Sequence, residues 1–264
     1  MKLKLTLIIA LLFLYAAGVS FGQDDEIQGP YQVATVAQFI TTGVTTPAAT
    51  YLLSESFDGS TACYSGQTPG TCDNTWTVSG DGTIDFAYTG LEGTYGLFLS
   101  KGTTETLAYA SFASSNIVYG YCMFRPVGLG NTATKFIFGV HSATGTSLGS
   151  AVINSNGTTA TLYARYGTEQ VNPTVATMSE GTTYHLWLEF NNVADCVKVW
   201  FSTTGTKPAD GGDNYSQAGA GCGGTATGST AAARVYLNSV GATEHDLVFD
   251  KVRVDDVAIG NNPS

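Results

Sequence analysis

Aromatic and basic side chains recur in the segments that are richest in strand-forming residues. Tyr and Trp rings pack against the C–H faces of sugars, while polar side chains hydrogen-bond to sugar hydroxyls. The chain has 14 Tyr, 13 Phe and 3 Trp. The candidates that could line a sheet face and bind a polysaccharide or other glycan are Tyr119, Tyr121, Arg125, His141, Tyr163, Arg165 and Trp187.

These aromatic residues also have an ordinary structural explanation, because any β-sandwich needs aromatic side chains for packing. Tyr166, next to Arg165, belongs to the same group of candidates. Trp76 and Trp200 are expected in the core. The residue types alone therefore leave binding and packing open for each position.

Motifs for metal or phosphate binding are absent from the sequence. The glycine runs at 211–212 and 221–224 are not followed by Lys-Ser or Lys-Thr, so they do not form a phosphate-binding loop. His141, His185 and His245 are too scattered for a metal site, and no Cys-x-x-Cys occurs. This pattern favours recognition over catalysis.

The five cysteines predict two disulfides and one thiol. Cys63 and Cys72 flank a short Gly- and Pro-containing stretch, and Cys196 and Cys222 could close a second loop. Cys122 would then remain as a buried thiol inside an apolar strand. Disulfides form in oxidising compartments, so this pairing is typical of an exported protein.

Residues 1–22 have the pattern of a secretory signal peptide. Lys2 and Lys4 precede an apolar stretch, and small residues precede the acidic residues that begin at position 24. We therefore expect cleavage after Gly22 and a secreted, extracellular protein. Residues 23–51 are expected to form an N-terminal extension that could serve as an extra or donor strand.

The charge balance excludes some classes of partner. The formal net charge is −10 and only 12% of the residues are charged, against about 25% in a typical domain. Nucleic acids require clustered Lys and Arg, so we expect no nucleic-acid partner. No later apolar run approaches the ~20 residues of a membrane span, so we expect no membrane partner.

Short segments rich in β-formers alternate with turn residues from about residue 52 onward. Residues 154–157, Asn-Ser-Asn-Gly, predict a hairpin turn. No segment shows a 3.6-residue period. The sequence therefore predicts an all-β, antiparallel sandwich, with strands at 117–125, 134–141, 159–166, 183–190, 196–202, 233–237 and 247–254.

The segment 184–190 alternates strictly. A period of two places Tyr184, Leu186, Leu188 and Phe190 on one face, which we expect to be the core face. The opposite face then carries Trp187 between a histidine and a glutamate. That face is either a concave outer surface or a surface covered by a neighbouring loop.

Three stretches of the chain resemble a known family. Leu53–Gly59 followed by Trp76, Thr182–Phe190 with Val197–Trp200, and Leu247–Gly260 resemble the opening strand, central hairpin and closing strand of the concanavalin A-like lectin/glucanase superfamily. The laminin-G-like and carbohydrate-binding jelly rolls are most similar. The resemblance implies a jelly-roll β-sandwich over residues 52–260 and a short tail at 261–264.

The resemblance also implies a place for calcium. In such jelly rolls the opening and closing strands are neighbours, and a structural calcium ion often lies there. Calcium prefers several oxygen ligands from carboxylates and carbonyls. By position, the resemblance assigns the metal-ligand role to Glu55, Asp58 and Asp250, which could otherwise be solvated strand ends.

Enzymes of this fold carry motifs that the sequence lacks. The glucanase pattern Glu-x-Asp-x-x-Glu, which supplies two carboxylates, does not occur. The alginate lyase patterns Gln-Ile/Val-His and Tyr-x-Lys-x-Gly do not occur either. Hydrolase or lyase activity is thus disfavoured, although Arg125, His141, Tyr163, Arg165 and Tyr166 could share one sheet face.

Two roles remain open on the sequence. The leading hypothesis is a secreted, non-catalytic, lectin-like protein that binds glycans. The alternative is a structural subunit of an extracellular fibre, coat or matrix. In that case the β-prone segment 31–40 would add a strand to the sheet edge of a neighbouring copy, and the protein would self-assemble.

Overall fold

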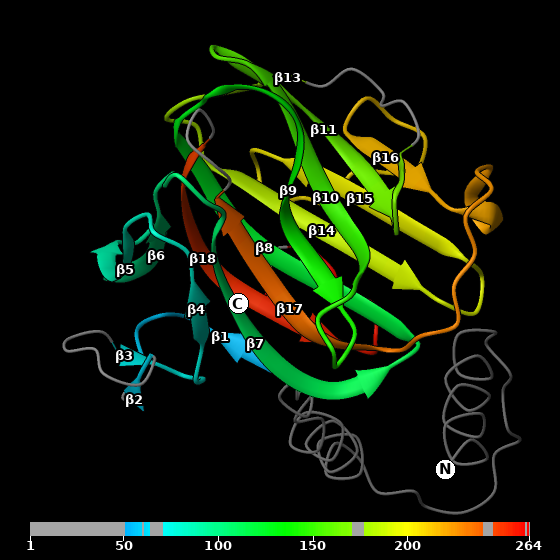
Figure 1. The fold of residues 1–264 in the computed structure, drawn as a ribbon, viewed down its shortest axis with the longest axis horizontal. Coiled ribbons are helices and arrows are strands. Elements are labelled where there is room, and N and C mark those ends of the chain that lie inside the picture. The colour runs from blue at the N-terminus through cyan, green and yellow to red at the C-terminus, as the bar shows by residue number, and fades with distance from the viewer. Residues whose placement is uncertain are drawn as a thin grey trace, which may run out of the picture. The chain divides into compact units, whose positions relative to one another are not determined.

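The computed structural model describes residues 51–59, 61–63, 71–170, 177–239, 245–261 and 263. The chain divides into two units, Met1–Ala49 and Thr50–Ser264. The expected signal peptide, the N-terminal extension and its donor strand lie outside the described residues. The second unit is a sandwich of two antiparallel sheets, which confirms the expected fold class (Figure 1).

The first sheet contains the longest strand of the molecule and the closing strand of the chain. Strand β1 (Leu53–Glu55) pairs with the closing strand β18 (Asp246–Asp255) and is an addition to the row of seven strands that makes up the sheet. The strands, in spatial order, are β16 (Tyr215–Ala218), β15 (Cys196–Ser202), β14 (Tyr184–Asn191), β8 (Ile117–Gly128), β18 (Asp246–Asp255), β6 (Tyr95–Leu99) and β5 (Ile84–Thr89), with β1 (Leu53–Glu55) beside β18.

The second sheet packs against the first. Strand β13 (Thr177–Ser179) pairs with β11, and a separate ribbon joins β2 (Thr61–Ala62) to β3 (Thr71–Cys72). The spatial order of the second sheet is β12 (Glu169–Gln170), β11 (Thr159–Tyr166), β10 (Ser147–Asn156), β9 (Asn131–His141), β17 (Ala232–Ser239), β7 (Thr106–Ser115) and β4 (Thr77–Ser79).

Alternation along the strands builds the core. On β14 the residues expected to face inward are buried in the main hydrophobic cluster, together with Val118 and Phe124 of β8. The two sheets approach closely at Gly120, where an added Cβ would lie 2.8 Å from the ring of Phe138. Apolar side chains buried from both sheets supply the main stabilisation of the sandwich.

Several local predictions are confirmed. Strands β14 and β15 form the expected hairpin, and β1 pairs with β18 through Leu53 and Val254. Strands β10 and β11 form the hairpin predicted from residues 154–157, with Gly157 at φ +89° in the turn. Among the described residues the only helix is a 3-10 turn at Ala220–Cys222.

The strand predictions were incomplete. Strands β7 and β10 were missed, because Thr106–Ser115 is rich in Ala and Ser, and Ser147–Asn156 combines Gly, Ser and Asn with only a short apolar run. The short strands β5, β6 and β16 were missed as well. Propensity is a weak guide where pairing with long neighbours holds a strand in place.

Both predicted disulfides are present. Cys63 is bonded to Cys72, and Cys196 is bonded to Cys222. Cys122 is a buried free thiol on the core face of β8. Two disulfides are consistent with an oxidising, extracellular environment.

A buried carboxylate organises the opening of the sandwich. Glu55, at the end of β1, accepts hydrogen bonds from the backbone N–H of Phe57 at 2.7 Å, Asp73 at 3.0 Å and Asn74 at 2.9 Å. The indole N–H of Trp76 donates to the same carboxylate at 3.0 Å. Glu55 therefore ties the start of the sandwich to the segment that follows the Cys63–Cys72 bridge.

Replacing Glu55 should destabilise the fold. In Glu55→Gln the side-chain NH₂ group replaces one carboxylate oxygen and cannot accept hydrogen bonds from the N–H groups that point at it. The negative charge that these N–H groups stabilise is also lost. We expect the free energy of unfolding to fall by about 2–4 kcal/mol, measured by urea denaturation. The exposed Asp256→Asn should change it by less than about 0.5 kcal/mol. Equal stability of the two variants would contradict a structural role for Glu55.

Candidate functional site

The outer face of the second sheet carries side chains from β17, one of its interior strands. Val235 and Leu237 of this strand are buried in the core, so Arg234, Tyr236 and Asn238 point the other way. Strand β17 pairs with β7 on one side and β9 on the other. Side chains from three strands therefore meet on this face.

Three aromatic rings form a continuous stack there. Tyr236 is stacked on Tyr109 of β7, with ring centroids 4.7 Å apart and planes at 12°. On its other side, Tyr236 is stacked on the imidazole of His141, with centroids 3.9 Å apart and planes at 19°. Cross-strand pairing of Tyr236 with Tyr109, and of Arg234 with His141, places these rings in contact.

Two arginines lie over aromatic rings at either side of this stack. The guanidinium of Arg234 lies 5.0 Å from the ring centre of Tyr109. The guanidinium of Arg165, from β11, lies 5.8 Å from the ring centre of Phe136. We call this surface the aromatic–arginine face and define it by six residues: Tyr109, Phe136, His141, Arg165, Arg234 and Tyr236.

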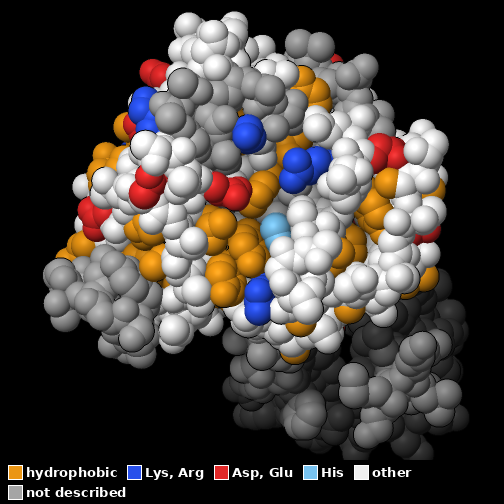
Figure 2. Space-filling view, viewed as in Figure 1, with side chains coloured by type: hydrophobic (Ala, Val, Ile, Leu, Met, Phe, Trp, Pro, Cys, Tyr) orange, Lys and Arg blue, Asp and Glu red, His pale blue; other side chains and the backbone are white. Residues whose placement is uncertain are grey.

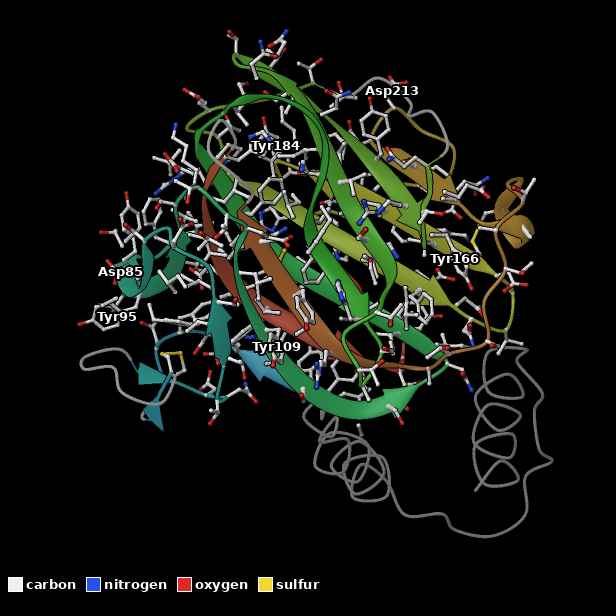
Figure 3. The ribbon with its side chains drawn as sticks, viewed as in Figure 1. Asp85, Tyr95, Tyr109, Tyr166, Tyr184 and Asp213 are labelled. Atoms are coloured by element: carbon white, nitrogen blue, oxygen red, sulfur yellow. A yellow bond between two sulfur atoms is a disulfide. The ribbon has the colours of Figure 1, made fainter. Side chains whose placement is uncertain are left out.

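The figures show how this face is composed. Figure 2 looks onto the second sheet and shows hydrophobic side chains across its middle, a histidine among them, and Lys and Arg side chains nearby. Figure 3 shows Tyr109 where β7 and β17 run side by side. Tyr109, Arg165 and Arg234 are half-buried, so parts of each can contact a ligand.

His141 is held as a neutral imidazole. Its side chain is 5% exposed, and its Nδ1–H donates to the backbone carbonyl of Gly145 at 2.9 Å. The pKa of His141 is lowered to about 4, mainly by burial and in smaller part by the positive charges of Arg165 and Arg234, while the hydrogen bond to Gly145 opposes the shift. With the proton on Nδ1, the Nε2 atom is a buried acceptor that has no hydrogen-bond partner in the part of the chain that the structure describes.

Other buried polar atoms on the same face also lack partners among the described residues. They are the hydroxyls of Ser147 and Ser150, the Oδ1 atom of Asn238 and the Nε–H of Arg165. Ser147 pairs across the sheet with His141, and Ser150 pairs with Arg165. A buried polar group without a partner costs about 1–3 kcal/mol, so this face is locally less stable than one whose polar groups are all paired.

A polar hollow continues this face along β10 and β11. It has a volume of about 330 Å³ and is lined by Asn131, Asn154, Ser155, Asn156, Thr159, Thr161 and Tyr163. Tyr163 is two residues from Arg165 on the same strand, and hence on the same side of the sheet. Amide and hydroxyl groups there suit hydrogen bonding to sugar hydroxyls.

Ser147 lies in the stretch Gly145-Thr-Ser-Leu-Gly149, which matches the Gly-x-Ser-x-Gly pattern of serine hydrolases. That motif requires a sharp turn between a strand and a helix. Here the stretch leads into β10 of an antiparallel sheet instead. Ser147 makes no hydrogen bond to His141, so the arrangement is not that of an activated nucleophile.

The structure divides the seven sequence candidates between two sheets. His141, Tyr163 and Arg165 lie together on the outer face of the second sheet. Tyr119, Tyr121, Arg125 and Trp187 lie on β8 and β14 of the first sheet, so they do not share a site with the other three.

Tyr166 lies on the core side of β11. Its ring contacts Phe190 at 6.0 Å, and its hydroxyl donates to Asp195 at 3.2 Å. Its position on the strand is labelled in Figure 3. Tyr166 therefore shares no face with Arg165, its neighbour in sequence.

The outer face of the first sheet is covered. Trp187 is 1% exposed, packs beside Ile259 in a second hydrophobic cluster, and donates its indole N–H to the carbonyl of Gly260 at 3.0 Å. Of the two interpretations of this face, cover by a neighbouring segment is correct. Trp76 is in the core as expected, whereas Trp200 lies in the second cluster under the ammonium group of Lys207, 3.6 Å from its ring centre.

A groove of about 730 Å³ adjoins this second cluster, but its polar groups bond to one another. Lys198 forms an ion pair with Asp210 at 3.0 Å, and Asp210 also accepts the indole N–H of Trp200 at 3.1 Å. Tyr215 donates to Gln217, which in turn donates to the carbonyl of Cys222. The aromatic–arginine face is the better candidate because more of its buried groups lack partners.

The residues predicted to bind calcium hold backbone N–H groups instead. Asp58 accepts from Thr94 and Tyr95, and Asp250 accepts from Leu91 and Glu92 at 2.8 Å. In the described part of the chain, no three His, Cys, Asp or Glu side chains are grouped as metal ligands. The described arrangement fits a calcium site poorly, and calcium binding stays a prediction of the resemblance.

Burial raises the pKa of Asp250 to about 6, and the nearby charge of Asp58 acts in the same direction. The backbone N–H groups of Leu91, Glu92 and Lys251 oppose this shift. The two aspartates therefore both anchor the loop of residues 90–95 through its backbone N–H groups.

The sequence analysis missed Tyr109, Phe136, Arg234 and Tyr236. The segment 233–237 was predicted as a strand, and its alternation could have placed Arg234 and Tyr236 on one face. Tyr109 lies on β7, which carries no clear strand signal.

The described residues contain no helix with the length and apolar character of a membrane span.

Removing the C-terminal residues should uncover Trp187. Deletion of Ile259–Ser264 removes the carbonyl that accepts its indole N–H and the side chain packed beside it. We expect a red shift of Trp fluorescence and a loss of about 2 kcal/mol in the free energy of unfolding. Val257→Ala, at a side chain that is 66% exposed, is the matched control and should change neither. An unchanged emission maximum in the deletion would contradict this cover.

The neutral state of His141 should make stability depend on pH. Its pKa is about 6.5 in the unfolded chain and about 4 in the folded protein, so the unfolded state binds more protons between these values. The stabilisation is present above pH 6.5 and is lost as the pH falls to 4, by up to about 3 kcal/mol.

The comparison of wild type with His141→Gln isolates this effect, because His245 and Asp250 titrate in both proteins. Gln can still donate to the carbonyl of Gly145. Denaturation curves at pH 4 to 8 give the free energy of unfolding of both proteins. The difference, wild type minus variant, should decrease as the pH is lowered from 6.5 to 4. A difference independent of pH would mean that His141 is not buried as a neutral group.

Comparison with known proteins gives the fold and no family. No protein-family model and no curated sequence matches the chain. Among solved structures, the cellulose-induced protein Cip1 is similar with a TM-score of 0.50 and 13% identity, over 79% of this chain and 99% of that one.

Two other solved structures show the range of similar proteins. The globular domain of T. cruzi calreticulin has a TM-score of 0.48 and 11% identity, over 79% of this chain and 88% of that one. The CBM2 module of the evolved Dit of Lactobacillus casei BL23 phage J-1 has a TM-score of 0.45 and 11% identity, over 77% and 94%. At these identities the likeness concerns the β-sandwich fold alone.

Proposed function

We propose that this protein is a secreted, non-catalytic, lectin-like β-sandwich of the concanavalin A-like type, which binds a polysaccharide or other glycan on its aromatic–arginine face. The stack of Tyr109, Tyr236 and His141, surrounded by buried polar atoms without partners, is the observation that carries this proposal. Aromatic faces with a few placed polar groups are what sugar binding requires.

The extent of the face supports a chain-like ligand. One row of paired residues crosses the second sheet from Arg165 through Ser150, Gly139 and Tyr236 to Tyr109. Neighbouring strands are about 4.8 Å apart, so this row is about 19 Å long. Gly139 and Ser150 have small side chains and keep its middle low, so a glycan lying across the strands would contact Arg165 at one end and Tyr109 at the other.

The electrostatics support binding rather than catalysis. A general base works best with a pKa near the operating pH, whereas the pKa of His141 is about 4. The hydroxyl of Ser147 makes no hydrogen bond that would activate it. The predicted disulfides and the signal-like residues 1–22 support secretion.

Self-assembly by strand addition stays a prediction of the sequence, because residues 31–40 lie outside the described part of the chain. Deletion of residues 23–50 separates the two roles. Glycan binding through the aromatic–arginine face should survive this deletion, whereas assembly by a donor strand should be lost.

The direct test is a glycan-array screen of the purified protein with and without calcium, together with its size distribution by light scattering. Selective binding of a glycan by a monomer would support the proposal. Large particles without a glycan signal would contradict it and favour the structural subunit. A calcium-dependent signal would support the metal site implied by the resemblance.

Tyr109 should be the most informative position for mutation. Tyr109→Ala removes the end of the ring stack, and we expect glycan affinity to fall at least tenfold, equivalent to about 1.4 kcal/mol, by isothermal titration calorimetry. Tyr109→Phe keeps the ring and should bind within about threefold of wild type. Tyr119→Ala, at a half-buried Tyr of the first sheet, is the control and should not affect binding.

If Tyr119→Ala weakens binding and Tyr109→Ala does not, the ligand binds the first sheet and the assignment of the site is wrong. The thermal melting temperature of each variant distinguishes lost contacts from lost folding.

A further inference from the structure

The aromatic–arginine face has a positive charge that contrasts with the rest of the protein. The chain has 21 Asp and Glu against 11 Lys and Arg, for a net charge of −10. Two of these few basic residues, Arg165 and Arg234, lie on this one face. Neither forms an ion pair with any carboxylate of the described residues.

The guanidinium of Arg165 is only partly exposed to solvent, and not all of its N–H groups form hydrogen bonds to the described residues. Its side chain is half-buried, and its Nε–H has no acceptor among residues 51–59, 61–63, 71–170, 177–239, 245–261 and 263. Burial lowers the pKa of Arg165, while the charge of Glu105 opposes that shift. Glu105 itself accepts a hydrogen bond from Asn238 at 2.6 Å, and it does not reach the guanidinium as an ion pair.

Aromatic rings are the nearest described contacts of the two arginines. Arg165 lies over Phe136, Arg234 lies over Tyr109, and the imidazole between them is neutral. Water is partly excluded by these rings, which strengthens charge–charge interactions with a ligand. A guanidinium has five N–H donors in a planar fork that fits a carboxylate or a sulfate in two parallel hydrogen bonds.

We propose that the ligand of the aromatic–arginine face is an acidic glycan chain, whose anionic groups are received by Arg165 and Arg234. This inference rests on the proposed function and adds the substrate class. The anionic group is a carboxylate of a uronic acid or a sulfate ester, since both present the same oxygen geometry to a guanidinium.

The spacing of the two arginines requires a polymer with repeated charges. Arg165 is on β11 and Arg234 is on β17, with β10 and β9 between them. Three strand spacings separate their backbones by about 14 Å. A single anionic sugar cannot contact both, whereas an oligosaccharide across the strands can place one charged residue at each end and pass over the edges of the stacked rings of Tyr109 and Tyr236.

Buried polar atoms that lack partners among the described residues lie below the surface between the two arginines. The hydroxyl of Ser150 lies in the row that joins Arg165 to Tyr236. Asn238 Oδ1 and His141 Nε2 are acceptors without partners on either side of Tyr236. These atoms are closed to solvent, so the groups that a glycan can reach here are the half-buried Tyr109, Arg165 and Arg234.

The test compares three probes by isothermal titration calorimetry: an oligogalacturonide, its methyl ester, which has the same sugar backbone without charge, and a sulfated oligosaccharide of similar length. We expect an anionic probe to bind at least tenfold more tightly than the methyl ester, with affinity that falls as salt is raised. The carboxylated and sulfated probes distinguish the two sources of the anionic group.

Substitutions assign the charges to residues. Arg165→Gln and Arg234→Gln should each weaken binding of the preferred anionic probe about tenfold and reduce its salt dependence. Arg165→Lys and Arg234→Lys keep the charge and should retain the salt dependence with intermediate affinity. Arg125→Gln, at the half-buried arginine of the first sheet, is the matched control and should bind as wild type does.

The outcomes separate the two proposals. Equal binding of neutral and anionic probes, unaffected by either Gln substitution, would overturn the acidic-glycan inference and leave glycan binding in place. Loss of binding only in Arg125→Gln would overturn the assignment of the site. No binding of any probe here or of any glycan on the array would contradict both proposals.

Discussion

The candidate site depends on the insertion of β17 between β7 and β9. Pairing on both sides fixes Tyr236 beside Tyr109 and Arg234 beside His141, although these partners are about ninety or more residues apart in the chain. Burial of Val235 and Leu237 in the core sets which side chains point outward. A slip of one residue would exchange the two faces of the strand and place an arginine in the core, so hydrophobic burial also specifies the site.

The sequence predicted the features that depend on local spacing. Alternation from Tyr184 to Phe190 identified the core face of β14, and Asn-Gly at 156–157 marked the hairpin between β10 and β11. The two disulfides also followed from spacing within loops. Each of these needs only a short stretch of chain and one periodicity, which is why no knowledge of the tertiary structure was required.

The composition of the site could not be predicted in the same way. His141 and Arg165 were candidates, but nothing local indicates that Arg234 and Tyr109 lie beside them, because strand order is a property of the whole sheet. Trp187 shows the converse problem. Its strand and direction were predicted correctly, yet the segment after β18 covers it, and a hydrogen bond to Gly260 comes from far along the chain. Whether an outward-pointing side chain such as Trp187 is exposed depends on which later segment of the chain packs over that face of the sheet.

The two outer faces of the sandwich differ in how far their polar groups are satisfied. On the first sheet, Trp200, Lys198 and Asp210 form a closed set of hydrogen bonds and an ion pair. On the second, His141, Ser150 and Asn238 are buried with atoms that lack partners. Folding alone would favour replacement of such groups by apolar ones, because each is costly in the free protein. This unbalanced cost falls on the face to which we assign glycan binding, so the proposed site is also the less stable of the two outer faces.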